Sequence, residues 1–109
     1  MKKIILIFLL FFNNLHASSF TLKKVINDLK SPWSLSFIDD TKLLITEKSG
    51  NIKLLNLKKN LVTDIKHNLN ILEDGQGGLL DILYLNKIVF VSYSENRSNG
   101  MSSTSVARA

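Results

Sequence analysis

Three glycines and one glutamine lie together in the segment Gly75–Asp81, which reads GQGGLLD. Glycine adopts backbone conformations that other residues avoid, and it lets a flat ligand approach the main chain closely. The amide of Gln76 can donate and accept hydrogen bonds, which suits carbonyl and carboxylate groups. No Lys-Ser or Lys-Thr pair follows, so a phosphate-binding loop is excluded. Two interpretations remain: a ligand-contacting loop of Gly75, Gln76, Gly77 and Gly78, or a flexible connector between strands.

Other residues with catalytic chemistry are few. His67 lies in the polar segment DIKHNLN, which favours an exposed histidine over a general base. The pairs Asp39–Asp40 and Glu73–Asp74 lie in predicted turns, where carboxylates bond to the backbone. Neither pair offers enough oxygen ligands for a metal ion. We therefore predict no catalytic residue and no metal ligand within this chain.

The N-terminus has the features of a secretory signal peptide over residues 1–17. Lys2 and Lys3 precede an apolar run, Ile4–Phe12, and the segment LHA favours cleavage after Ala17. The run is shorter than the roughly 20 residues that span a bilayer. We expect a periplasmic or secreted protein without a stable membrane anchor. An uncleaved anchor is the alternative interpretation.

The composition of the remaining residues, 18–109, limits the partners. The chain carries a net charge of +5, but its lysines are scattered rather than clustered as in nucleic-acid-binding proteins. We therefore expect no nucleic-acid partner. The chain contains no cysteine, so packed apolar surface must supply the stability that disulfides often give to exported proteins.

Short runs of β-forming residues separated by turn residues predict an all-β fold. The first group of predicted strands comprises residues 20–26, 33–38, 42–48, 52–57 and 61–66. In the segment WSLSFI, Trp33 and alternate apolar residues share one face, and Ser34 and Ser36 share the other. A second group begins at residues 79–85 and 87–93 and ends at 104–109.

The second group repeats the first at an offset of 45 residues, from Leu35 to Leu80 and from Lys42 to Lys87. A four-stranded unit repeated at this period is typical of β-propeller blades; a simple meander is the alternative. Segments such as KLLITE and KIVFV predict sheets that are apolar on both faces, so each face needs a neighbouring blade. In this arrangement Trp33 is expected to pack between blades, and buried Glu47 to pair with a lysine or arginine elsewhere in the whole protein.

Leaving about 1,000 Å² of apolar surface uncovered would forgo about 25 kcal/mol, more than a domain of this size has in reserve. We therefore expect residues 18–109 to be the N-terminal portion of a longer propeller. The sequence predicts one blade, a leading strand and half of a second blade.

The segments SPWSLSFIDDTKLLITEKSGNIKLLNL, GQGGLLDI and VFVSYSE resemble the start of the glucose/sorbosone dehydrogenase family, over about Ser31 to Arg108. This family of soluble quinoproteins includes aldose sugar dehydrogenases. The resemblance implies a six-bladed propeller with pyrroloquinoline quinone (PQQ) and calcium in its central channel. It also implies oxidation of the C1 hydroxyl of an aldose to a lactone, with electrons passed to an external acceptor. By position, Gln76 would contact the cofactor, and Gly75, Gly77 and Gly78 would shape the loop.

The sequence departs from the family pattern after Asp81. The segment DILYLNK lacks the His-Pro-Asp-Phe stretch of the family, which implies a shortened turn. The catalytic histidine, quinone-binding arginines and calcium ligands that the resemblance implies would lie in later blades. We therefore expect this chain alone to be inactive. A secreted, non-catalytic propeller that serves as a binding module remains the alternative function, because fold alone does not fix activity.

Overall fold

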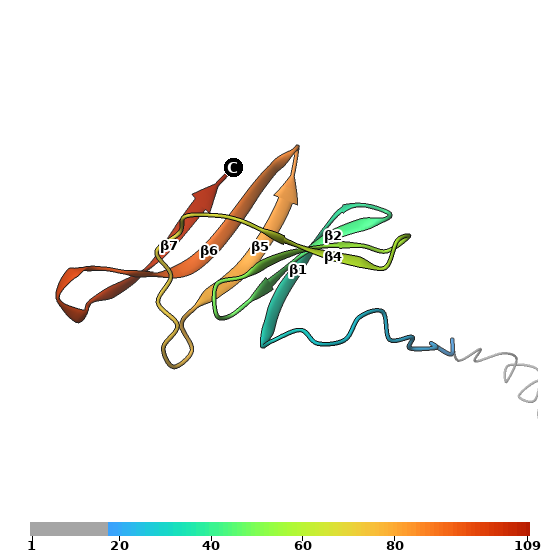
Figure 1. The fold of residues 1–109 in the computed structure, drawn as a ribbon, viewed down its shortest axis with the longest axis horizontal. Helices are drawn as coiled ribbons and strands as arrows, with labels where there is room; N and C mark the ends of the chain where they lie inside the picture. The colour runs from blue at the N-terminus through green and yellow to red at the C-terminus, as the bar shows by residue number, and fades with distance from the viewer. Residues whose placement is uncertain (1–17) are drawn as a thin grey trace, which may run out of the picture.

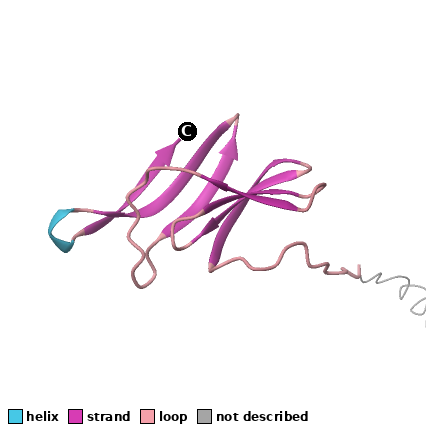
Figure 2. Cartoon of the chain, viewed as in Figure 1, coloured by secondary structure: helices cyan, strands magenta, loops and turns pink. Residues whose placement is uncertain are grey.

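The computed structural model describes residues 18–109, and the predicted signal peptide lies outside this range. The described part is all-β, as expected, apart from one short 3₁₀ turn (Figures 1 and 2). Its elements are β1 (Pro32–Asp39), β2 (Lys42–Glu47), β3 (Ile52–Asn56), β4 (Leu61–Ile65), β5 (Leu79–Leu85), β6 (Ile88–Asn96), η1 (Ser98–Gly100) and β7 (Ser102–Arg108). Within residues 18–109, no helix has the length and apolarity needed to cross a membrane.

The first sheet is antiparallel with the order β1-β2-β3-β4, so each strand pairs with its neighbour in sequence. Leu44 of β2 lies opposite Ser36 of β1 on one side and Leu54 of β3 on the other. Five consecutive residues of β2, Leu43–Glu47, are buried, because both faces of this central strand are covered. This sheet confirms the predicted four-stranded unit.

The second sheet has the order β5-β6-β7 and therefore contains more than the half blade expected. Strands β5 and β6 are joined by a two-residue turn, with Leu85 opposite Ile88. Both turn residues have positive φ, 52° at Asn86 and 66° at Lys87, which is the backbone geometry that matches the twist of a tight hairpin. The turn lies in the segment after Asp81 where the sequence predicts a shortened turn, and its length relative to the family stays a prediction.

The main core lies between the two sheets. It is formed by the buried residues Leu44, Ile52, Leu79, Ile82, Val91 and Tyr93. A second cluster, Leu43, Ile45 and Leu55, lies on the opposite face of the first sheet, where Ile26 and Leu29 partly cover it. The first sheet is thus apolar on both faces, as the sequence predicts, and one face packs against the second sheet.

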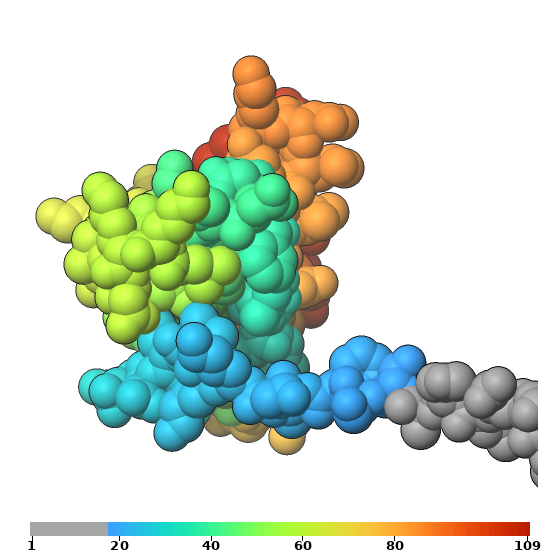
Figure 3. All heavy atoms as spheres, turned by 90° about the vertical axis from the view of Figure 1, so that its right-hand side faces the viewer, coloured from blue at the N-terminus to red at the C-terminus, as the bar shows by residue number. Residues whose placement is uncertain are grey.

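The predicted leading strand, residues 20–26, is wrong. This segment is extended but pairs with no strand among the described residues, and it leads away from the first sheet (Figures 1 and 3). Phe20 is 90% exposed and Leu22 is 97% exposed. A run of β-forming residues becomes a strand only where a sheet edge satisfies its backbone groups, and this segment meets none.

The place of Trp33 between two blades stays a prediction, because the described residues include only one neighbour of the first sheet. The alternation along β1 is as predicted, but Trp33, Leu35 and Phe37 lie on the outer face of the first sheet and are about half exposed. Ser34 and Ser36 instead face the second sheet, where their hydroxyls accept hydrogen bonds from the backbone of β5. The serine face, rather than the aromatic face, therefore joins the two sheets.

Candidate functional site

The predicted ligand loop forms a tight turn between the two sheets, directly before β5. Its amide at Gly77 donates to the carbonyl oxygen of Asp74 over 2.7 Å. Gly75 has a φ of 52°, and a Cβ atom placed there would meet no atom within 4 Å. Gln76 is exposed at the tip. In Figure 1 the turn projects beyond the start of β5, and both Gly75 and Gln76 are exposed.

The base of the loop is packed against both sheets. Gly78 has a φ of 154°, and a Cβ atom there would lie 2.7 Å from Cγ of Lys48 and closer still to the Lys48 carbonyl oxygen. At Gly77, a Cβ atom would lie 2.7 Å from Oγ of Ser94. Close approach of neighbouring chain segments therefore accounts for these two glycines. Gly75 and Gln76 are the residues of the predicted site that stay open to a ligand.

Backbone hydrogen bonds also attach the ends of the loop to the two sheets. The amide of Leu79 donates to the carbonyl oxygen of Lys48 over 2.9 Å, and that of Ser94 donates to Gly78 over 2.8 Å. The Leu72 amide donates to the carbonyl oxygen of Ser94, also over 2.8 Å. These bonds anchor both ends of the loop, and its tip projects from the anchored base.

A polar seam that the sequence analysis missed joins β1 to β5 beside the loop. The hydroxyl of Ser34 donates to the carboxylate of Asp81, which also accepts from the amide of Ile82 over 2.9 Å. Ser36 accepts from the Tyr84 amide over 2.9 Å. A register shift in β5 between Leu79 and Ile82 accompanies this arrangement. The lone aspartate within the apolar segment LLDILYL, Asp81, is the sequence feature that could have indicated this seam.

Glu47 is buried, and its partners lie within the chain rather than elsewhere in the whole protein. Its carboxylate accepts from the Lys30 amide over 2.7 Å and from the side-chain amide of Asn51 over 2.8 Å, and Nζ of Lys53 lies 3.9 Å away. Burial raises the pKa of Glu47, but these bonds outweigh that effect and hold the pKa below its usual value. The carboxylate ties residue 30 to the β2–β3 hairpin, which is a structural role.

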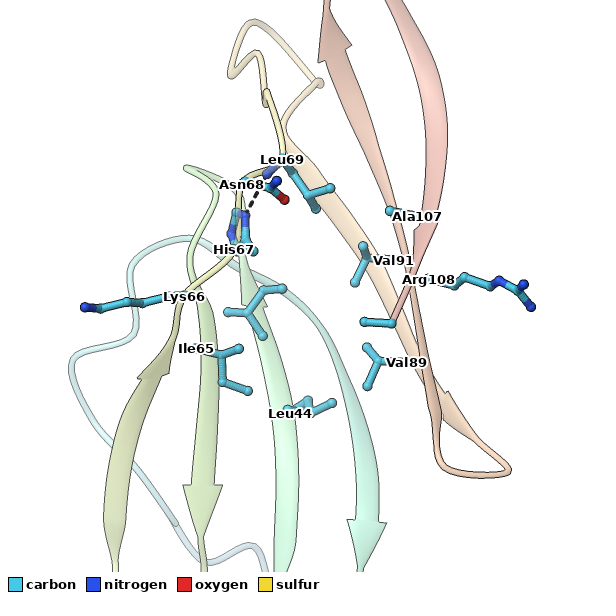
Figure 4. Close-up of a pocket in the computed structure, with 12 residues that line it drawn as sticks. Leu44, Ile65, Lys66, His67, Asn68, Leu69, Val89, Val91, Ala107 and Arg108 are labelled. Atoms are coloured by element: carbon cyan, nitrogen blue, oxygen red, sulfur yellow. Dashed lines mark hydrogen bonds between the residues drawn. The ribbon is translucent and has the colours of Figure 1, made fainter.

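His67 is exposed, as predicted, and both ring nitrogens have partners. Its Nδ1 accepts from the Leu69 amide over 3.2 Å, so Nε2 carries the hydrogen and donates to the Gly50 carbonyl oxygen over 2.6 Å. The ring lies at the rim of an apolar cavity of about 230 Å³ between the sheets. In Figure 4 aliphatic side chains such as Leu44 and Val91 point into this cavity, whereas Lys66 and Arg108 point away. We assign no chemistry to it.

The predicted turn role of the carboxylates is confirmed at Asp39. Its side chain accepts from the amide and the hydroxyl of Thr41, each over 2.7 Å. The hydroxyl bond is the main reason that the pKa of Asp39 lies below its usual value. Across residues 18–109, no group of three or more His, Cys, Asp or Glu side chains converges in a way that could hold a metal ion.

Comparison with known proteins places these features in a family. A model of the family described as "Glucose / Sorbosone dehydrogenase" matches residues 29–109. Aldose sugar dehydrogenase YliI of Escherichia coli K12 is 31% identical over 84 residues, which cover 72% of this chain and 23% of that protein.

Solved structures of sugar dehydrogenases also resemble this chain. A crystal structure of a glucose dehydrogenase has a TM-score of 0.74 and 32% identity, over 81% of this chain and 27% of the other. The apo form of the soluble aldose sugar dehydrogenase from Escherichia coli has a TM-score of 0.66 and 30% identity, over 73% and 25%. The PQQ-bound aldose sugar dehydrogenase from Streptomyces coelicolor, 22% identical with a TM-score of 0.69, shares the fold over 80% and 26%.

The chain spans about a quarter of the length of these relatives. The matched region contains both sheets and the GQGG loop, and the antiparallel sheets match part of the propeller of these dehydrogenases. The chain belongs to the glucose/sorbosone dehydrogenase family.

Proposed function

We propose that the protein containing this chain is an exported, PQQ-dependent sugar dehydrogenase that oxidises the C1 hydroxyl of an aldose to a lactone. An external acceptor would take up the electrons. The relatives named above are aldose sugar and glucose dehydrogenases, and one of them is a PQQ-bound form. The observation that carries the proposal is the projecting turn directly before β5, in which Gln76 is exposed.

The open residues of the turn fit a planar quinone with carbonyl and carboxylate groups. The Gln76 amide is exposed and can donate to such groups, and the space beside Gly75 leaves room for a flat ring against the backbone. Gly77 and Gly78 would act indirectly, by letting the base of the turn pack against Ser94 and Lys48. When bound, the quinone supplies the hydride acceptor that no amino-acid side chain can provide.

Calcium does not fit the described residues, because they contain no cluster of acidic ligands that could bind it. We expect a calcium site in the whole protein to draw most of its ligands from outside residues 18–109. The same holds for the general base, since His67 is held between Gly50 and Leu69 and lies at the rim of an apolar cavity. This chain would hold and orient the cofactor through Gln76, while other parts of the protein move the proton.

Export completes the proposal. Removal of residues 1–17 would release the protein to the periplasm or the medium, where it would meet its sugar substrate and an external acceptor.

The test uses the full-length protein that contains this chain. PQQ and calcium are added, and aldose-dependent reduction of a dye is measured together with quinone affinity from absorbance titration. We expect turnover in the wild type, and weaker quinone binding in Gln76→Ala than in the control Asn27→Ala, an exposed amide in the N-terminal segment. A protein that binds sugar without quinone binding or turnover would instead be a non-catalytic binding module.

A further inference from the structure

We propose that Lys48 is a positioning residue that holds the tip of the Gly75–Gly78 turn, and with it Gln76, in its binding geometry. This inference rests on the proposed function, in which Gln76 contacts the quinone. Lys48 follows β2 and contacts three separate segments. Its amide donates to Ser31 over 3.0 Å, its carbonyl oxygen accepts from the Leu79 amide over 2.9 Å, and its ammonium donates to the carbonyl oxygen of Gly75.

The ammonium contact matters because the tip has little other support. The Gly77 to Asp74 hydrogen bond lies inside the turn and does not attach the turn to a sheet. The bonds from Leu72 and to Gly78 fix the two ends of the loop to Ser94. Within residues 18–109, the Lys48 side chain forms the one hydrogen bond that links the tip itself to the first sheet.

Lys48 is well placed to act as a fixed support, because its own backbone is constrained. The preceding residue, Glu47, is buried and bonded to Lys30 and Asn51. On the other side, Gly78 lies so close to Lys48 that no side chain could fit between them. The stem of the lysine therefore starts from a rigid point, and its partly buried side chain spans the gap to Gly75.

Removing the ammonium is expected to loosen the tip without loosening its base. If the binding geometry then exists in about a tenth of the molecules, the apparent quinone Kd rises about tenfold, because affinity falls with the competent fraction. Lys48→Met removes the donor and keeps most of the apolar stem. Lys48→Arg keeps a cationic donor and should restore most of the affinity. Lys58→Met, in the exposed turn after β3, is the matched control for loss of one lysine.

The experiment combines quinone titration with hydrogen exchange on the full-length protein without quinone. We expect Lys48→Met to raise the Kd about tenfold and to speed amide exchange at residues 75–77, with exchange in β2 and β5 unchanged. At saturating quinone, the turnover rate should equal that of the wild type.

Three results would overturn the inference. Lys48→Met could bind PQQ as tightly as Lys58→Met, or exchange could speed up throughout β2 and β5, which would make Lys48 a general stability residue. The arginine variant could also bind no better than the methionine variant. A wild type that does not bind PQQ at all would refute the proposed function instead, so the two failures are distinguishable.

Discussion

Substituting Gly78 by alanine should separate the structural glycines of the GQGG turn from those open to a ligand. Gly78 has a φ of 154°, a conformation that costs a residue with a side chain about 1–3 kcal/mol. The new Cβ would also press on Lys48, 2.7 Å from Cγ and closer to the carbonyl oxygen. Relief requires the strands to move apart, which loses the bond from the Leu79 amide and about 1 kcal/mol more. We expect Gly78→Ala to destabilise the protein by about 2–4 kcal/mol in total.

The matched control is Gly75→Ala in the same turn. Its φ of 52° also disfavours alanine, at about 1 kcal/mol, but the added Cβ meets no atom within 4 Å. Urea unfolding of the full-length protein measures both changes, and quinone titration of the folded variants measures binding. We expect Gly75→Ala to weaken quinone binding at little cost in stability, and Gly78→Ala to show the larger loss of stability. Equal losses of stability in the two variants would refute the assignment of Gly78 to packing.

Three further predictions follow from the described contacts. Because the pKa of Glu47 is depressed in the folded protein, its contribution to stability is present above the unfolded value near 4.5 and is lost as the pH falls through the folded pKa. Glu47→Gln should therefore lower stability at pH 7 and flatten its decline below pH 4.5 in urea unfolding at several pH values; an unchanged decline would contradict this. Lys87→Gly should raise stability by about 1 kcal/mol, because glycine tolerates the φ of 66°, whereas a loss of stability would mean that the lysine side chain contributes to the turn. Residues 18–109 expressed alone should aggregate or melt without cooperativity, since Trp33, Leu35 and Phe37 leave an apolar face half exposed, and a cooperative melt of a soluble monomer would contradict that expectation.

The sequence predicted the strands and their order well, because alternation and turn residues act locally. It predicted a strand at residues 20–26 for the same reason and was wrong there, because a strand also needs a partner that local sequence does not reveal. The candidate loop was found from its glycines, yet the different reasons for Gly75 and Gly78 depend on what lies beside each one. No sequence feature marked Lys48 as part of the candidate site. Its proposed positioning role arises from contacts with residues 17 positions before it and 27 positions after it.

The two faces of β1 show what decides which face of an inner strand meets the next sheet. Hydrophobicity alone favours the aromatic face, but the two sheets lie closest along β1 and β5, where the serine hydroxyls reach the β5 backbone. Only small side chains fit where backbones approach so closely, and a hydroxyl can also satisfy the exposed amides of an edge strand.

Farther from this seam the sheets diverge, and larger residues such as Leu44 and Ile52 fill the space, with the cavity of about 230 Å³ beyond them. The contact between the sheets is therefore wedge-shaped. It is narrow where small polar residues line the seam and wider where branched apolar residues fill the space. That wedge fixes the angle between the sheets and holds the GQGG turn beside their line of closest approach. The serines of β1, which carry no obvious chemistry in the sequence, thus help to hold β5, the strand that directly follows the candidate turn.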